Sequence, residues 1–197
     1  MANIARDIEL LYEIGSLRNV QRGWMQHLGT SCASDLEHTM RVMFLALALA
    51  RREGYGNEEL IMKMALVHDI AETRTADHSI VQKVYVKENE EAAIHDMLSD
   101  TSLSNLEDIA KLYAARESIE AKLVKDADNL DVDLELRELE ERGHQLSKKW
   151  ATFRKLVRDE KLYTQSAKLY WDEIQASDPA SWHLTTNKWT KIPNAGR

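Results

Sequence analysis

The segment from Lys63 to Asp77, KMALVHDIAETRTAD, begins as an apolar helical pattern and then places ionisable side chains on the face that the pattern would bury. His68 and Asp69 are adjacent, and Glu72 follows Asp69 by three residues, so the three share one face if the helix continues. A buried carboxylate needs a partner, because removing its charge from water is costly. The segment therefore predicts a bound cation, compensating charges or a cleft, and an Asp–His pair that stabilises a core is the alternative.

A second inward histidine belongs to the apolar segment DLEHTMRVMFLALALA. His38 shares a helical row with Val42, Leu45 and Leu49, so it is expected to point inward from the first turn of a buried helix. A lone inward histidine is more often a hydrogen-bonded core residue than a ligand. His38 gains a functional interpretation only if other ligands lie beside it.

Acidic residues recur in a third segment, AKLVKDADNLDVD. The periodicity places Asp131 on the apolar stripe of this segment and Asp128 on its flank beside Val124. Asp126 and Asp133 are expected to point away from the stripe and to lie on a solvated face. The pattern admits either Asp128 or Asp131 as an inward carboxylate and does not choose between them.

Three segments thus offer inward ligands: His38, the pair His68–Asp69, and Asp128 or Asp131. Two imidazoles and two carboxylates suit one divalent metal ion such as Mn, Co, Ni, Fe(II) or Zn, with Mg as a further candidate, and leave positions open for water and substrate. Such an ion would neutralise the carboxylates and satisfy the histidines together. A metal site therefore explains all three segments.

The elements that must position these residues are helices. Only 7 glycines and 2 prolines occur in 197 residues, which favours long helices. Apolar periodicity predicts helices at 3–17, 36–52, from 58 onward, 88–99 and 106–118, then a long helical segment that ends at about 142, and a last helix around 162–174. Gly54–Gly56 would stop the second helix, and Asn57 would be the N-cap of the third. We expect an all-α protein with one domain over 1–197, comprising a metal-site core at about 20–143 and a C-terminal helix with a tryptophan-containing tail at about 144–197.

Composition narrows the classes of function. A net charge of −7 argues against a protein that coats nucleic acid. The single cysteine, Cys32, allows no disulfide framework and no cysteine-based zinc site. No signal peptide is evident, and the longest apolar run, 42–50, is too short to span a bilayer, so we expect a cytoplasmic protein that does not bind a membrane.

The order His, His-Asp, Asp on successive helices resembles that of the HD-domain metal-dependent phosphohydrolases, and most of all the 5′-deoxynucleotidases among them. The matching pieces are GW at 23–24, EHTMRV at 37–42, ALVHDIAE at 65–72, Asp77, and AKLVKDAD at 121–128. The resemblance implies an HD-domain helical bundle built around a single metal site. It selects Asp128 over Asp131, because the family's aspartate lies three residues after the lysine of VKxxD.

The resemblance also implies roles for individual residues. The metal ligands would be His38, His68, Asp69 and Asp128, and Glu72 would act with Asp69 in catalysis, as the acid/base group or by positioning the attacking water. Trp24 would pack against the substrate, and Asp77 with the residues just after it, His78 among them, would contact its sugar or phosphate. Beside these, Arg22 and Lys83 are local cations that could bind the phosphate. Arg74 is a further local cation that could stabilise a phosphate.

Some positions depart from the family pattern, all on the substrate side. Where some members have an arginine directly before the tryptophan, this chain has Gly23, with Arg22 one position earlier. The family's frequent Gly-Asp after the HD helix is Ala76–Asp77, followed by His78. These changes leave the metal ligands in place and concern the identity of the substrate.

The function implied is release of phosphate from deoxyribonucleoside 5′-monophosphates, by a metal that lowers the pKa of a bound water. An HD hydrolase of another phosphorylated small molecule, such as a nucleoside polyphosphate or a phosphodiester, is the alternative. A non-catalytic nucleotide- or metal-binding regulator is a second alternative, although such a protein would not need Glu72. The resemblance further implies that the protein forms a homodimer. It also implies that the protein binds a small nucleotide substrate and does not bind nucleic acid.

Overall fold

The computed structural model describes residues 3–184, and these residues form helices and connecting turns without a β-sheet. The only β-type pairing within them is an isolated bridge between Gln21 and Ser34. The elements in chain order are α1 (Ile4–Gly15), η1 (Ser16–Asn19), α2 (Met25–Leu28), α3 (Asp35–Arg52), α4 (Glu58–Val67), α5 (Glu72–Thr75), η2 (Gln82–Val84), α6 (Glu90–Leu98), α7 (Leu106–Ala115), α8 (Ile119–Glu141), α9 (Leu146–Glu160), α10 (Gln165–Ala176) and α11 (Ser181–Leu184). The prediction of an all-α fold is confirmed.

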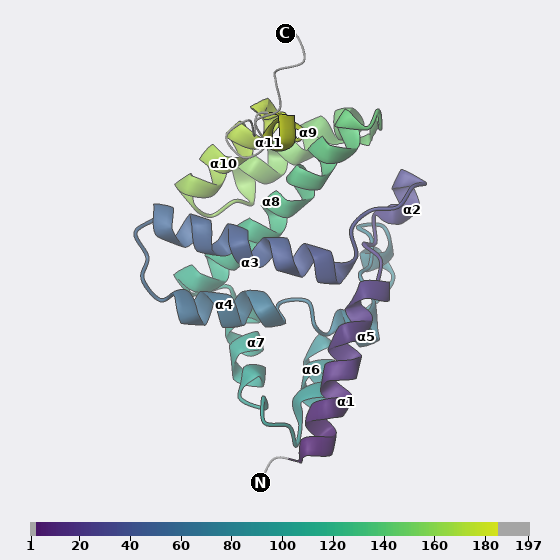
Figure 1. The fold of residues 1–197 in the computed structure, drawn as a ribbon, viewed down its shortest axis with the longest axis vertical. Helices are drawn as coiled ribbons and strands as arrows, with labels where there is room; N and C mark the ends of the chain where they lie inside the picture. The colour runs from purple at the N-terminus through teal and green to yellow at the C-terminus, as the bar shows by residue number, and fades with distance from the viewer. Residues whose placement is uncertain (1–2, 185–197) are drawn as a thin grey trace.

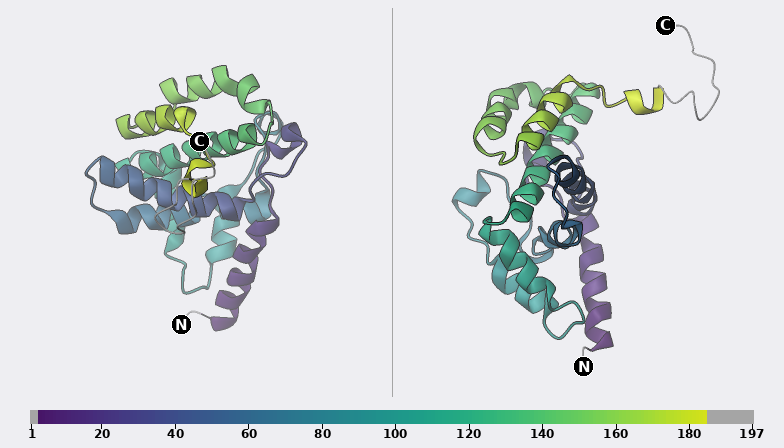
Figure 2. Two further views of the ribbon diagram at one scale, coloured as in Figure 1. Left: turned by 45° about the horizontal axis from the view of Figure 1, so that its top comes forward. Right: turned by 90° about the vertical axis from the view of Figure 1, so that its left-hand side faces the viewer.

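Helix α8 runs through the middle of the molecule and is covered on several sides (Figures 1 and 2). Helices α3, α4 and α7 pack against it from one side, and α9 and α10 from the other. The largest apolar core lies between α3, α4, α8 and α10, around Leu49, Ile61 and Leu130, which are fully buried. This arrangement brings the ligand-bearing segments of the sequence to one place.

The ends of α3 have local causes in the sequence. Ser34 and Glu37 form a capping box, in which each side chain accepts a hydrogen bond from the other residue's backbone N–H. The helix stops at Arg52, and Gly54 follows with φ of +70°, a conformation that favours glycine. The cap places His38 in the first turn of the buried helix, as the sequence predicts.

Helix α4 begins after its predicted N-cap, Asn57, and ends at Val67, just before the His68–Asp69 pair. Asn57 accepts a hydrogen bond from the backbone N–H of Leu60. The regular helix stops at Val67, and the chain continues through tight turns in which Glu72 N donates to Asp69 O at 3.0 Å. Glu72 therefore begins the next helix, α5, and the turns keep it beside the His68–Asp69 pair.

Two acidic residues of α8 do not lie where the sequence pattern placed them. Asp126 and Asp133 were expected on a solvated face, and both are buried. Asp126 accepts hydrogen bonds from the backbone N–H groups of Tyr163 and Thr164, at 2.7 and 2.9 Å. Asp133 accepts two from Arg154. The expectation was wrong because α9 and α10 cover the side of α8 that the apolar stripe leaves.

Helix α9 is an element for which the sequence analysis made no prediction, whereas α10 falls where its apolar positions predicted a last helix. A small apolar cluster holds α9 against the loop near α2, and it contains Trp24, Leu136 and Leu146, with Trp150 packed at its edge. The predicted tail after Pro179 lies largely outside the described residues. None of the described helices combines the length and the apolar character needed to span a membrane.

Candidate metal centre and active site

Four side chains from three segments converge at one point. His38 from α3, His68 and Asp69 from the end of α4, and Asp128 from α8 each bring one ligand atom within 4.8 Å of the others. Nε2 of His38 lies 3.2 Å from an oxygen of Asp128 and 3.4 Å from one of Asp69. Nε2 of His68 lies 3.0 Å from the same Asp69 oxygen. The structure thus brings together the four residues that the sequence singled out as ligands.

The two imidazoles are held in a defined orientation by their other nitrogens. Nδ1 of His38 lies 2.6 Å from an oxygen of Asp131, which also accepts a hydrogen bond from Arg41. Nδ1 of His68 donates to the carbonyl oxygen of Ala65 at 2.8 Å. Partners of this kind place the proton on Nδ1 and leave the Nε2 lone pair free for a metal. Asp131, the alternative inward carboxylate, therefore orients His38 instead of joining the four.

The charges at this point favour a bound cation. Burial would raise the pKa of Asp69, but His68 and His38 hold it well below its usual value. Burial likewise opposes ionisation of Asp128, and Lys125 together with His38 keeps its pKa well below the usual range. Burial would lower the pKa of His38, yet its carboxylate neighbours raise it well above the ordinary value.

The same residues fit a divalent metal by donor type and geometry. The two Nε2 atoms lie 3.3 Å apart, so two lone pairs would face each other unless a proton or a cation stood between them. A metal ion replaces that proton, because imidazole must be neutral to coordinate. Two imidazole nitrogens and two carboxylate oxygens suit a borderline transition metal and do not fill an octahedral shell.

Glu72 lies next to this centre in an acidic surrounding. Burial, followed by the charges of Asp69, Asp77 and Asp35, raises the pKa of Glu72 to about 12. Its Oε2 and the Oδ2 of Asp35 are buried and receive no N–H donor among the described residues. A proton on Glu72 shared with Asp35 satisfies both oxygens. Burial and the neighbouring carboxylates thus favour the protonated form of Glu72, which is the form that can give a proton.

Arg22 stands between the acidic groups. Its guanidinium lies 3.3 Å from Asp35, 3.3 Å from Asp77 and 3.7 Å from the ligand Asp69. Burial alone would lower the pKa of Arg22, but Asp77 and the other carboxylates raise it. The side chain is thus a permanently charged, buried cation beside the metal ligands.

The glycine before Trp24 is required by the packing. Gly23 donates its backbone N–H to Asp77 at 3.0 Å. A Cβ atom at this position would lie 2.5 Å from the backbone nitrogen of Ser79 and 2.6 Å from the carbonyl oxygen of Asp77. No side chain fits here, and the side chain that reaches the metal ligands comes from Arg22, one residue earlier.

A cavity of about 490 Å³ opens directly onto the metal ligands. His68, Asp69 and Glu72 line its inner end. Four cations lie along its walls, together with the acidic residues Glu90, Glu91 and Glu107: Lys83, Lys111, Arg116 and Lys125. Lys83 is the one among these cations that the sequence analysis named. Arg116 and Lys125 were missed, although Lys125 belongs to the VKDAD segment.

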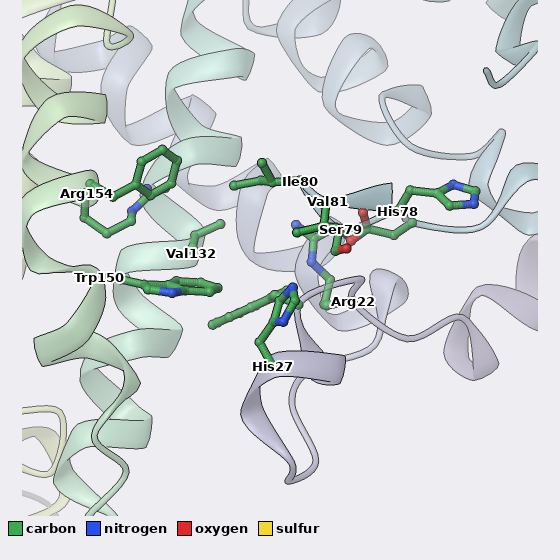
Figure 3. Close-up of a pocket in the computed structure, with 12 residues that line it drawn as sticks. Arg22, His27, His78, Ser79, Ile80, Val81, Val132, Trp150 and Arg154 are labelled. Atoms are coloured by element: carbon green, nitrogen blue, oxygen red, sulfur yellow. Dashed lines mark ion pairs between the residues drawn. The ribbon is translucent and has the colours of Figure 1, made fainter. Parts of the chain in front are cut away.

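A second cavity, of about 570 Å³, is lined by Arg22 on one side and by Trp150 of α9 on another (Figure 3). Trp24 and Asp77 line it, as does His78, which the sequence placed on the substrate side. The imidazole of His78 points away from Arg22, and its Nδ1 lies 2.7 Å from an oxygen of Glu88. His78 thus borders the cavity without reaching the metal ligands.

One candidate cation is directed elsewhere. Arg74 donates two hydrogen bonds to Glu13 of α1, at 2.5 and 3.0 Å, and lies 3.8 Å from Asp96. It lines neither of the two cavities beside the metal centre. The prediction that Arg74 is available to a phosphate is not supported by this arrangement.

Residues 14–171 match the model of the family described as HD domain, so the chain belongs to this family. The resemblance to HD-domain metal-dependent phosphohydrolases noted in the sequence is thereby confirmed.

Named relatives carry the comparison further. A protein called 5′-deoxynucleotidase HDDC2 from Danio rerio is 30% identical over 141 residues, which cover 68% of this chain and 70% of the relative. Its namesake from Dictyostelium discoideum is 30% identical over 155 residues, which cover 72% of this chain and 82% of the relative.

Solved structures show the same fold. A conserved hypothetical protein from Pyrococcus furiosus superposes with a TM-score of 0.70 at 25% identity, covering 86% of this chain and 99% of the other. A "predicted metal-dependent phosphohydrolase" from Magnetospirillum magnetotacticum superposes with a TM-score of 0.66 at 21% identity, covering 88% of this chain and 94% of the other.

Proposed function

We propose that this HD-domain hydrolase is a 5′-nucleotidase that releases phosphate from deoxyribonucleoside 5′-monophosphates. The observation that carries the proposal is the convergence of His38, His68, Asp69 and Asp128 beside the carboxyl group of Glu72, which lines the same cavity. The relatives named 5′-deoxynucleotidase, at 30% identity over about seven-tenths of the chain, support the choice of substrate.

In this proposal the four converging residues hold one divalent metal ion. When bound, the ion would lower the pKa of a water molecule and draw charge from the phosphoryl oxygens. Asp131 and the carbonyl of Ala65 keep the two imidazoles turned toward it. Lys125, 2.5 Å from the outer oxygen of Asp128, balances part of the charge of that ligand.

Glu72 would move the proton that the reaction needs. Its raised pKa makes it an acid that can protonate the 5′-oxygen as the phosphate leaves, after which the carboxylate can accept a proton from water. Asp35 lies beside it and shares a hydrogen bond with the Glu72 carboxyl group. This pair gives Asp35, which the sequence analysis did not name, a positioning role.

Cations on both sides of the centre would stabilise the phosphate. A phosphomonoester needs charge stabilisation more than covalent help during transfer. Arg22 lies at the inner side of the centre, and Lys83, Arg116 and Lys125 line the cavity on the outer side. Asp77, which accepts from Gly23 and pairs with Arg22, would face the sugar.

Phosphate release from ribo- and deoxyribonucleoside 5′-monophosphates tests the proposal. Chelator-stripped protein would receive Mn, Co, Mg or Zn, and Asp69→Asn would be compared with Asp96→Asn, an exposed aspartate of α6. We expect release that needs metal, favours deoxy substrates, and disappears only in Asp69→Asn.

Absence of release from every monophosphate with every metal would contradict the proposal. Release from polyphosphates or diesters in that case would identify the alternative substrate class. Tight nucleotide binding without turnover would instead indicate a regulator.

A further inference from the structure

The cavity between Trp24 and α9 has walls of a different chemistry from the cavity at the metal ligands. Its lining residues are Arg22, Trp24, His27, Asp77, His78, Ser79, Ile80, Val81, Val132, Trp150, Phe153 and Arg154. Figure 3 shows Trp150 on one side of this space and Ile80, from the loop after α5, on the other. A cavity of about 570 Å³ with mostly apolar and aromatic walls is of the size that holds a small organic ligand.

The aromatic side chains of this cavity are held against one another. The rings of Trp24 and Trp150 have centroids 5.7 Å apart and are tilted by 32°, and His27 meets Trp150 edge-on at 6.4 Å. Trp24 is buried, so Trp150 offers the more accessible ring. These contacts fix a flat aromatic surface, on which a planar ring can stack.

The opposite wall leaves apolar side chains in contact with solvent. Ile80 and Val81 are 64% and 57% exposed, and Phe153, which lies on the same helix as Trp150, is 42% exposed. A planar ring between these side chains and Trp150 would remove apolar surface on both of its faces from water. Arg154 also lines the cavity, but its guanidinium already donates hydrogen bonds to Asp133 and to the carbonyl of Asn129, so its charge is not free to bind a ligand.

Arg22 is the residue that lies between this cavity and the metal ligands. Arg22 and Asp77 line it, and the guanidinium of Arg22 lies 3.7 Å from the ligand Asp69. The cavity on the other side, by contrast, is lined by Lys83, Arg116 and other charged groups, which suit phosphate and water. One molecule with a phosphate at the metal centre and an aromatic ring beyond Arg22 would match both surroundings.

We propose that this second cavity binds the nucleobase of the substrate, and that Trp150 and Phe153 of α9 form the wall against which the base stacks. The proposal rests on the proposed nucleotidase function and adds to it a specificity element on α9. It predicts that the base contributes to binding separately from the phosphate.

The test compares a substrate that carries a base with one that lacks it. Initial rates would be measured with thymidine 5′-monophosphate and with deoxyribose 5-phosphate, for wild type, Trp150→Ala and Trp150→Phe. Trp182→Ala, an exposed tryptophan of α11, is the matched control. Since base stacking on an aromatic side chain is worth about 1–3 kcal/mol, we expect Trp150→Ala to raise the KM for the nucleotide about 10-fold.

The other readouts separate stacking from folding. The kcat for both substrates and the KM for deoxyribose 5-phosphate should stay unchanged in Trp150→Ala, and Trp150→Phe should retain most of the wild-type KM. Equal changes with both substrates, or no change with either, would overturn the assignment while leaving the nucleotidase function intact.

A binding measurement covers the case in which neither substrate is hydrolysed by wild type. Equilibrium dialysis with thymidine, which has no phosphate, would then test the cavity alone. Binding by wild type that is weakened about 10-fold in Trp150→Ala supports the assignment. No binding, or equal binding by both proteins, contradicts it.

Discussion

Four aspartates on the single helix α8 serve two different purposes. Asp128 and Asp131 face the metal centre, where one meets the Nε2 atoms of the histidines and the other holds Nδ1 of His38. Asp126 and Asp133 face α9 and α10, where they bind backbone N–H groups and Arg154. The four have the same residue type, and each is largely buried.

The difference lies in what neutralises each carboxylate. Asp133 receives both of its hydrogen bonds from one arginine, and Asp126 receives its three from the cap of α10, so the chain itself satisfies them. Asp128 shares its surroundings with Asp69 and with two imidazoles whose free nitrogens point at the same spot. Burial alone therefore does not identify a metal ligand. A metal site is indicated when carboxylates and imidazole nitrogens converge on one point, as Asp69 and Asp128 do with the two histidines.

The largest expected effect comes from Asp128→Asn. Losing a charged ligand should cost more than losing a partner of a ligand, so kcat/KM should fall by more than about 100-fold. The metal-free protein should keep its fold, because Lys125, which pairs with this side chain, remains partly exposed to water. Phosphate release measures the expected loss of activity, and thermal unfolding of the metal-free protein shows whether the fold is kept. A variant that keeps its activity would remove Asp128 from the ligand set.

Asp133→Asn should show the reverse behaviour. It leaves the buried Arg154 guanidinium without its carboxylate, and breaking a buried ion pair in this way costs about 3 kcal/mol of stability. Chemical denaturation measures that loss, and kcat of the folded protein should equal that of wild type. A fall in kcat without a fall in stability would show that the two sides of α8 are not separate.

Asp131→Asn tests the intermediate case. The amide can no longer hold the Nδ1 proton of His38 by charge, and outer carboxylates of this kind contribute about 10–100-fold in metal affinity. Metal titration of activity should show a weaker apparent Kd, with kcat recovered at high metal concentration. An unchanged Kd would mean that burial and the amide oxygen suffice to orient the imidazole.

Asp126→Asn is expected to have the smallest effect. Two backbone N–H groups and the hydroxyl of Thr164 donate to this side chain, and an amide oxygen can still accept part of that set. The stability should fall by about 1–2 kcal/mol, because hydrogen bonds to a charged group are replaced by bonds to a neutral one. Denaturation measures this loss. A change in metal affinity instead would contradict the separation.

Sequence reasoning identified the metal side of this comparison and failed on the other. The positions of His38 and His68 follow from apolar periodicity and helix caps, which are local properties. Periodicity alone left Asp128 and Asp131 open, and the family resemblance chose Asp128, which the structure places beside His38, His68 and Asp69. The local sequence pattern could not predict that α9 and α10 cover Asp126 and Asp133, because these contacts join residues far apart in the chain.

The helix α9 could have been predicted from the sequence by a pattern that the sequence analysis did not use. Trp150, Phe153 and Val157 recur at spacings of three and four in this helix, which is an amphipathic pattern. Arg22 and Lys83 could be named from their proximity in sequence to the motif. Arg116 could not, because it reaches the metal-side cavity only through the packing of α7 against α4.

The most direct test of the central claim, that His38, His68, Asp69 and Asp128 hold one metal ion, is metal content after dialysis. Protein equilibrated with Mn or Zn would be analysed as wild type, Asp128→Asn and Asp133→Asn. The account predicts one ion per chain in wild type and in Asp133→Asn, and almost none in Asp128→Asn. An ion retained by Asp128→Asn, or none bound by wild type, would contradict it.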